Sequence, residues 1–264
     1  MKLYIPTLGR ADNQITFDNL PKFLQERTTL VVQPHEKHLY DGYPILILPN
    51  DWMGISRTRK WIIEHAGKNL FGMLDDDFEL RRRFDESPTK RPLTKEDWHE
   101  FYDTIIEWLN ADCTFAGVRR GNLPPVGKNT MDNTETLQAT FYNGNKLPNT
   151  NELIWNHDLV SEDVNLHLQL LIRGHRNRVW CKYGSVSKWA QKGGCQSGIN
   201  PRTVKMINES HERLIELYPN FVKWNMQNGK QKIAGLSFNK GYKAIKVFYS
   251  NAYKSSRIKT LNFE

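Results

Sequence analysis

Three consecutive aspartates directly after a short apolar segment form the most chemically capable group in the 264-residue sequence. Residues 70–74 read LFGML, which predicts a buried strand, and Asp75, Asp76 and Asp77 follow it. Because alternate residues of an extended chain share a face, Asp75 and Asp77 should converge while Asp76 points elsewhere. Two such oxygen ligands suit Mg²⁺ or Mn²⁺, which can also bind a diphosphate and neutralise the charge that builds on it as it leaves. The alternative is a solvated acidic turn.

A second pair of carboxylates, Glu162 and Asp163, stands at the start of a predicted helix over residues 161–173. A carboxylate within reach of an acceptor hydroxyl can remove its proton during group transfer. Acids in a first helical turn are also ordinary partners of the helix dipole. The pair therefore indicates catalysis only in combination with the three aspartates.

Strands and helices alternate over the first half of the chain and place the aspartates in a recognisable context. Apolar, β-branched segments predict strands over residues 2–6, 28–33, 43–48 and 70–74, and helical patterns cover residues 11–23 and 54–66. This alternation predicts the α/β class, with a mostly parallel, doubly wound sheet and flanking helices. Such sheets bind ligands at the carboxyl ends of their strands, where the aspartates would lie.

The second half of the chain is less regular. We predict helices over residues 96–110, 161–173 and 201–217, and strands over residues 113–118, 137–142 and 178–186. Ser161 is expected to cap the helix that begins beside it, and Gly174 to end that helix. Beyond Pro219 no firm period is visible, and the sequence contains no internal repeat.

Net charge is segregated along the sequence. The chain has 37 Lys and Arg against 29 Asp and Glu, a formal net charge of +8, and nine of these bases but only one acid lie in residues 222–264. The other 221 residues therefore carry 28 charges of each sign (37 − 9 and 29 − 1). We predict a domain over residues 1–221 and a basic, aromatic C-terminal region over residues 222–264, packed on the same domain, that contacts a polyanion.

Two basic segments are candidates for that contact. In the C-terminal region Lys240, Lys243 and Lys246 recur at three-residue intervals among aromatic residues, and Lys254 and Arg257 continue the charge. Lysines supply affinity for phosphates and aromatic rings can stack on bases. The loop of residues 189–198 adds Lys192 and Trp189, next to Lys188, and two glycines that could let it close over a phosphate. The alternatives are a solvated basic face and a surface turn.

Several classes of protein are excluded. No apolar run approaches the roughly 18 residues that span a bilayer, and residues 1–10 lack the apolar centre of a signal peptide, so we expect a soluble, cytoplasmic protein without a membrane partner. Three separated cysteines suggest neither a disulfide framework nor a zinc site. Glycine-rich dinucleotide motifs, Walker loops and serine-hydrolase elbows are not present in the sequence.

Four separated motifs together resemble the GT-A type nucleotide-sugar glycosyltransferases over about residues 1–200. They are Ile5-Pro6-Thr7-x-x-Arg10, the helix with Arg57 and Arg59, Leu74-Asp75-Asp76-Asp77, and Ser161-Glu162-Asp163 before an apolar helix. Within that fold the chain is most similar to the bacteriophage TET-associated glycosyltransferases, which add a sugar to 5-hydroxymethylated pyrimidines in DNA. One departure is Lys60, where the family usually has asparagine after the arginine.

The resemblance implies a role for each matching residue. Asp163 would be the catalytic base and Glu162 would orient hydroxyl groups. The donor would contact Thr7 and Arg10 under the nucleotide, Glu36 at the base or ribose, Arg59 at the diphosphate or sugar, and Asp75 and Asp76 at the ribose and sugar hydroxyls. Asp77, with Asp75, would hold the metal.

The function implied is metal-dependent transfer of a sugar from a nucleoside diphosphate sugar to a hydroxymethylated pyrimidine in double-stranded DNA. UDP-linked glucose or arabinose and 5-hydroxymethylcytosine are the expected substrates, and a phage-encoded chain would act in the host cytoplasm. A glycosyltransferase for a surface polysaccharide, or a non-catalytic DNA-binding protein on a degenerate GT-A scaffold, are the alternatives. The sequence names neither the sugar, nor the stereochemical outcome, nor the oligomeric state.

Overall fold

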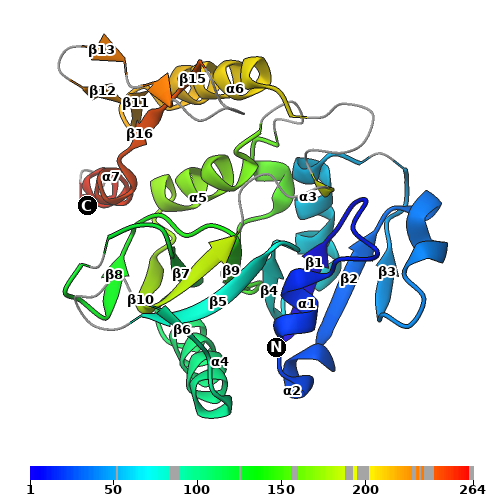
Figure 1. Cartoon of the computed structure of the whole chain (residues 1–264). Helices are drawn as coiled ribbons and strands as arrows, with labels where there is room; N and C mark the ends of the chain where they lie inside the picture. The colour runs from blue at the N-terminus through cyan, green and yellow to red at the C-terminus, as the bar shows by residue number, and fades with distance from the viewer. Residues whose placement is uncertain are drawn as a thin grey trace.

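The core of the protein is one ten-stranded mixed sheet, with strand order β3-β2-β1-β4-β9-β7-β10-β5-β6 and β8 paired to β10 (Figure 1). The computed structural model describes residues 1–51, 53–83, 90–124, 126–155, 160–187, 193–194, 202–227, 230–231, 233–234 and 241–261. The strands are β1 (Lys2–Pro6), β2 (Thr28–Val32), β3 (Ile45–Ile47), β4 (Leu70–Leu74), β5 (Phe78–Arg83), β6 (Lys90–Pro92), β7 (Phe115–Arg120), β8 (Thr130–Asp132), β9 (Ala139–Asn143) and β10 (Asn177–Ser187).

The first four predicted strands are confirmed and form the parallel half of the sheet. β1 lies between β2 and β4 and runs parallel to both, and β3 adds to β2 in the same direction. The carboxyl ends of β1 and β4 therefore meet at one edge of the sheet. This pairing brings the loop after β1 to the three aspartates after β4.

Beyond β4 the sheet becomes mixed. β9 runs antiparallel between β4 and β7, β10 is parallel to β7, and β5 returns antiparallel beside β10. The strands β5, β6 and β8 were not predicted, because their charged residues obscure the alternation that marks a strand. In β5 only Phe78 and Leu80 are apolar, and both are buried against α4 (Lys95–Asn110).

Helices cover both faces of the sheet. One face packs against α1 (Ile15–Asn19), α2 (Lys22–Gln25) and α4, and the other against α3 (Ile55–Ala66) and α5 (Glu162–Ile172). α7 (Tyr249–Leu261) packs beside α5, and α6 (Val204–Leu217) lies beyond α5, away from the sheet. Two short 3₁₀ turns are η1 (Pro34–Leu39) and η2 (Thr150–Glu152). The α/β class is thereby confirmed. No helix in the described part of the chain is both long and apolar enough to span a bilayer.

Two expectations about helices were wrong. The single helix over residues 11–23 is divided into α1 and α2 at Pro21, which is in extended conformation and lacks the N–H that a continuous helix needs. Ser161 does not cap α5 with its side chain. It has a left-handed φ of 102°, and its own N–H donates to Glu162 Oε2 at 3.3 Å.

The C-terminal region forms regular structure that the sequence pattern did not reveal. β11 (Val222–Trp224) and β16 (Ile245–Val247) form an antiparallel ribbon, which we call the C-terminal ribbon, and α7 follows it; the short strands β12 (Met226–Gln227), β13 (Lys230–Gln231), β14 (Ile233–Ala234) and β15 (Tyr242–Lys243) form two further pairs. Tyr249 and Ala252 of α7 are buried in the same apolar cluster as α5. The functional division near residue 221 stays a prediction.

Candidate active site

The loop after β1 is tied to the middle and last aspartates. Thr7 Oγ1 donates to Asp76 Oδ2 at 2.8 Å, and the Arg10 guanidinium forms ion pairs with Asp76 and, at 3.1 Å, with Asp77 Oδ2. Asp76 is buried, whereas the side chains of Asp75 and Asp77 are 30% and 25% exposed. Burial raises the pKa of Asp76 to about 6, although Arg10 opposes the shift. Asp76 thus points inward and Asp75 and Asp77 face solvent, as the alternation predicts.

Arg59 of α3 joins the end of β4 to the start of α5. Its Nη2 donates to Asp75 Oδ1 at 2.8 Å and its Nε to Glu162 Oε1 at 2.9 Å, and its side chain is only 7% exposed. Burial raises the pKa of Asp75 to about 7 against the opposing charge of Arg59, and burial likewise raises the pKa of Glu162. Burial works against the charge of Arg59 itself, but the carboxylates of Asp75 and Glu162 leave its pKa raised. The two predicted carboxylate groups therefore form one site.

Asp163 lies beside this ion pair at the start of α5. It is partly exposed, and its Oδ1 accepts the N–H of Val164 at 2.7 Å. Its negative charge contributes to the raised pKa values of Asp75 and Glu162, so it lies within electrostatic range of both. A partly exposed carboxylate at this position can accept a proton from a bound hydroxyl group.

A buried polar pair beneath Asp163 was missed by sequence reasoning. Tyr142 Oη and His167 Nε2 are 3.0 Å apart, and the His167 ring stacks on Phe115. Burial lowers the pKa of His167 to about 4, so the imidazole is neutral at pH 7. The only available signal was the position of His167, one helical turn after Asp163.

Glu36 supports the loop after β1 from below. Both of its carboxylate oxygens accept the N–H of Gly9, at 2.9 and 3.0 Å, and Tyr40 Oη lies 3.4 Å from Oε2. Gln14, which is fully buried, donates to Thr7 Oγ1 at 3.0 Å and to the Arg10 carbonyl at 2.7 Å. Glu36 and Gln14 therefore fix the backbone that carries Thr7 and Arg10.

The two described glycines of the loop after β10 rest on Arg10. Gly194 N–H donates to the Leu8 carbonyl at 2.7 Å, and Arg10 Nη2 donates to the Gly193 carbonyl at 3.4 Å. Both glycines have positive φ, 90° at Gly193 and 60° at Gly194. A side chain at Gly193 would collide with Arg10, because its Cβ would lie 2.3 Å from Arg10 Cγ.

Arg202, just before α6, is another charged residue that sequence reasoning missed. Its positive charge acts to lower the pKa of Glu162, which places it near the carboxylates. Its only signal was its position between a proline and the threonine that caps α6.

The predicted nucleic-acid contacts are only partly described. Lys188, Trp189, Lys192 and Lys240 lie outside the described residues. Lys243 and Lys246 belong to β15 and β16, and Lys254 and Arg257 are exposed on α7. These four side chains belong to the C-terminal region, apart from the cluster around Arg59.

Asp75 and Asp77 are the described residues best suited to hold a divalent cation. Both present partly exposed carboxylates, although each also pairs with an arginine, Arg59 for Asp75 and Arg10 for Asp77. Within the described ranges no three His, Cys, Asp or Glu side chains converge on a common point. A cation here would therefore need oxygen ligands from a bound substrate.

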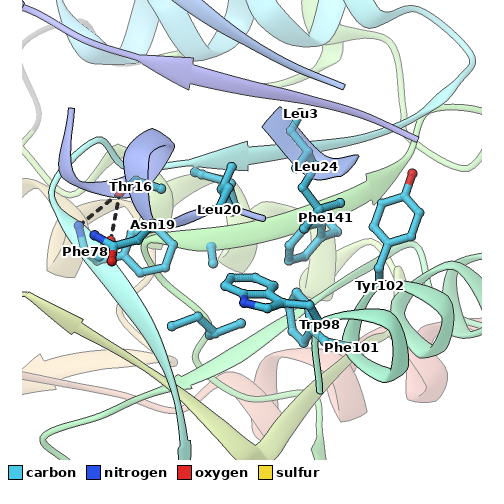
Figure 2. Close-up of a pocket in the computed structure, with 13 residues that line it drawn as sticks. Leu3, Thr16, Asn19, Leu20, Leu24, Phe78, Trp98, Phe101, Tyr102 and Phe141 are labelled. Atoms are coloured by element: carbon cyan, nitrogen blue, oxygen red, sulfur yellow. Dashed lines mark hydrogen bonds between the residues drawn. The ribbon is translucent and has the colours of Figure 1, made fainter. Parts of the chain in front are cut away.

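An apolar pocket lies behind the aspartate turn, as Figure 2 shows. Its lining comes almost entirely from aliphatic and aromatic side chains of α1, α2, α4 and the sheet, including Leu20, Trp98 and Phe141, so it does not suit a nucleotide. At its rim Thr16 Oγ1 donates to the Asp75 carbonyl at 2.6 Å and accepts the Phe78 N–H at 3.1 Å. Thr16 thus holds both ends of the turn that carries the aspartates.

Comparison with known proteins identifies the fold and the family of the chain. The described fold is that of GT-A glycosyltransferases: a crystal structure of S. aureus TarS 1–349 in complex with UDP-GlcNAc superposes with a TM-score of 0.51 at 12% identity, over 83% of this chain and 67% of that chain. The sequence profile of the TET-associated glycosyltransferase family matches residues 1–194, and the chain belongs to that family.

Two phage proteins are similar over most of the chain. The beta-glucosyl-HMC-alpha-glucosyl-transferase of Enterobacteria phage T2 is 27% identical over 251 residues, which cover 88% of this chain and 87% of that protein. The protein of the same name from Enterobacteria phage T6 is 25% identical over 280 aligned positions, covering 99% and 97%. The chain is therefore a glycosyltransferase by family and fold.

Removing the Thr16 hydroxyl should destabilise the aspartate turn. Thr16→Val keeps the shape of the buried side chain but leaves the Phe78 N–H without its acceptor, which costs about 1–3 kcal/mol. Thr16→Ser retains the hydroxyl and should remain closer to the wild type. Denaturant unfolding measures both; a Thr16→Val protein as stable as the wild type would show that these hydrogen bonds do not hold the turn.

Placing a side chain at Gly193 should displace the loop that rests on Arg10. Gly193→Ala combines the left-handed backbone with the collision at Arg10, whereas Gly42→Ala has a similar φ of 83° with no atom within 4 Å. Both carry the left-handed penalty of about 1–2 kcal/mol. Thermal denaturation should show the larger loss for Gly193→Ala, and equal losses would mean that the loop does not depend on this contact.

Proposed function

We propose that this protein transfers a sugar from a nucleoside diphosphate sugar to a hydroxymethylated pyrimidine in double-stranded DNA. The observation that carries the proposal is Arg59, which joins Asp75 at the end of β4 to Glu162 beside Asp163. A donor-binding edge and a candidate base are thereby held in one site. The names of the two phage relatives, with HMC as part of the acceptor, support the DNA base as substrate.

The donor would lie over the loop after β1 and the aspartates. Thr7 and Arg10 would support the nucleotide, with Glu36 close to its base or ribose, because Glu36 fixes the backbone of this loop. Asp75 would contact ribose or sugar hydroxyls, and Arg59 the diphosphate or sugar. Asp76, expected from the sequence to contact hydroxyls as well, is buried on Thr7 and Arg10 and would instead hold these two residues in place. Arg10 and Arg59 each bring a positive charge to the edge at which a diphosphate would leave.

Asp75 and Asp77 fit Mg²⁺ or Mn²⁺. These cations are usually bound by one or two carboxylates with substrate phosphates completing the shell, which matches two partly exposed carboxylates without a third described ligand. When bound, the cation would neutralise negative charge on the departing nucleoside diphosphate. Chelation with EDTA should therefore abolish transfer, and added Mn²⁺ or Mg²⁺ should restore it.

Asp163 would act as general base. Its partly exposed carboxylate would take the proton of the acceptor hydroxyl as the oxygen bonds to the anomeric carbon and the bond to the diphosphate breaks. Glu162 is buried on Arg59 and would orient the acceptor or donor hydroxyls from the adjacent position. We propose UDP-linked glucose or arabinose as donor and 5-hydroxymethylcytosine as base. The relatives' names favour glucose, and they extend the acceptors to test to glucosylated hydroxymethylcytosine.

The C-terminal ribbon would bind the DNA backbone. Lys223 and Lys246 lie directly opposite each other on its two strands and both are exposed. Like charges in a cross-strand pair repel, and a polyanion relieves that repulsion. Lys243 is less available, because its ammonium lies 3.5 Å from Glu212 and over the Trp224 ring.

Transfer tests the proposal directly. Nucleoside mass analysis should detect a new glycoside when hydroxymethylated or glucosylated DNA is incubated with a nucleotide sugar and Mn²⁺. Asp163→Asn and Asp77→Asn should each lower the rate at least about 100-fold, as expected for a lost general base or metal ligand. Binding to DNA should survive in both variants.

The exposed residue Asp103 provides the control. Asp103→Asn also removes one negative charge, but Asp103 belongs to α4, which contributes no residue to the candidate site. Full activity of Asp163→Asn would refute its role as base. Transfer to a glycan but never to DNA would select the surface-polysaccharide alternative instead.

Neutralising the cross-strand lysines should weaken binding to duplex DNA. Each lysine that no longer neutralises a phosphate reduces the steepness of log K against log salt by about 0.9, so the double variant Lys223→Gln/Lys246→Gln should reduce it by up to about 1.8. Lys205→Gln removes one charge from α6 whose ammonium lies 3.7 Å from Glu209, and it serves as control. An unchanged slope in the double variant would show that DNA does not bind this ribbon.

A further inference from the structure

The five arginines of β5 and β7 differ in whether a carboxylate lies beside them. Three of them contact a carboxylate: Arg81 pairs with Glu79, Arg82 with Asp97 and Arg120 with Glu135. Arg83 and Arg119 have no carboxylate partner among the described residues, and neither does Lys90 of β6. Within the described part of the chain these three cations therefore have no opposite charge beside them, whereas Arg81, Arg82 and Arg120 do.

Strand register places these three residues on one face of the sheet. Arg83 is opposite Lys90, and Arg119 is opposite Gly184, which in turn is opposite Arg81. This face is turned away from α4, because Arg82, the neighbour of both Arg81 and Arg83, reaches the α4 residue Asp97. Gly184 has no side chain, and a Cβ there would lie 2.9 Å from Arg83 Nε. The guanidinium of Arg83 therefore occupies the space over this glycine.

Backbone carbonyls hold the two guanidinium groups without neutralising them. Arg83, which is 6% exposed, donates to the Leu123 carbonyl at 2.8 Å and to the Arg120 carbonyl. Arg119 donates to the Pro124 carbonyl at 3.3 Å and to the Met131 sulfur at 3.7 Å. The Nε atoms of both arginines are buried and find no hydrogen-bond partner among the residues that the structure describes.

The neighbouring positive charges oppose one another, in addition to the cost of burial. Burial lowers the pKa of Arg83 and the charge of Arg119 lowers it further, and burial followed by the charge of Arg83 lowers the pKa of Lys90. Burying an unpaired charge is costly, so uncompensated buried cations that persist in a fold are expected to meet an anion. Lys90 and Arg119 are partly exposed, which gives an anion access from solvent.

We propose that Arg83, Lys90 and Arg119 form a binding site for a phosphate group. The partly exposed guanidinium of Arg119 and ammonium of Lys90 would contact the phosphate oxygens. The buried guanidinium of Arg83 already donates to two carbonyls and would add its positive charge from beneath. The phosphate could be a phosphodiester of the DNA backbone or a free phosphate. Both sources present the same tetrahedral oxygens to these three side chains.

The DNA source rests on the proposed function and is compatible with the geometry of β5. This strand begins directly after the aspartates, and Arg83 lies six positions after Asp77, about 20 Å at strand rise. Phosphates recur about every 3.4 Å along each strand of a duplex. A duplex whose modified base reached the active site would therefore extend past the cluster.

Two variants with a matched control test the site. Arg119→Gln and Lys90→Gln remove uncompensated charges, whereas Arg81→Gln removes a charge on the same face that Glu79 already offsets. Arg83 is left unchanged because it holds two carbonyls. Inorganic phosphate, compared with chloride at equal ionic strength, should raise the Tm of the wild type and Arg81→Gln by about 2–4 °C more than that of Arg119→Gln or Lys90→Gln.

A second measurement distinguishes a phosphate of the DNA backbone from free phosphate. If the DNA backbone binds here, the slope of log K against log salt for unmodified duplex DNA should fall by about 0.9 in Arg119→Gln and stay unchanged in Arg81→Gln. A Tm effect with an unchanged slope assigns the site to free phosphate. Equal phosphate stabilisation of all four proteins together with unchanged slopes overturns the proposal. Neither measurement uses a donor or a modified base, so the result stands even if transfer to DNA is not observed.

Discussion

The site depends on the pairing of Arg59 with two carboxylates from distant parts of the chain. Asp75 ends β4 and Glu162 begins α5, and a single guanidinium on α3 contacts both at less than 3 Å. Removing one member of a buried ion pair typically costs about 3–5 kcal/mol, because the remaining charge is left without compensation. Each carboxylate therefore helps to keep the arginine buried, and the arginine helps to keep both carboxylates at this edge. The pairing adds to the apolar packing of α3 and α5 in the core, which brings the two helices to the sheet.

A second arginine performs the corresponding task on the other side of the aspartates. Arg10 pairs with Asp76 and Asp77, and the loop that carries it is fixed by Glu36 and Gln14. Acidic and basic side chains thus alternate across the edge. Such an arrangement holds carboxylates in fixed orientations before any ligand arrives, which is the electrostatic preorganisation that transfer of a charged leaving group requires.

The sequence predicted the parallel half because local signals and burial agree there: β1, β2 and β4 are apolar segments, and α3 ends at a glycine. Strand β5 was missed because four of its six residues are charged. Helix α7 was missed because it has few apolar residues, and these are buried only through contact with the cluster that includes α5. The sequence indicated which residues could do chemistry, but it did not indicate which of them pair with one another. The aspartate run and the Glu162-Asp163 pair stand out, yet nothing in their spacing indicates Arg59 as the bridge. The pairing of Tyr142 with His167 could not be predicted, because only the packing of α5 against β9 brings the two side chains together.

The count of charges along the sequence and the arrangement of charges in the structure point to different binding sites for a polyanion. By count, the entire surplus of +8 belongs to residues 222–264 and the remainder is neutral. In the structure Lys243 of the basic region is offset by Glu212, whereas Arg83 and Arg119 of the neutral part have no carboxylate beside them among the described residues. Formal neutrality is a sum over a segment, and it does not require each charge to find a partner. Contact with a polyanion is therefore better sought where buried or opposed cations remain uncompensated than where basic residues are most frequent.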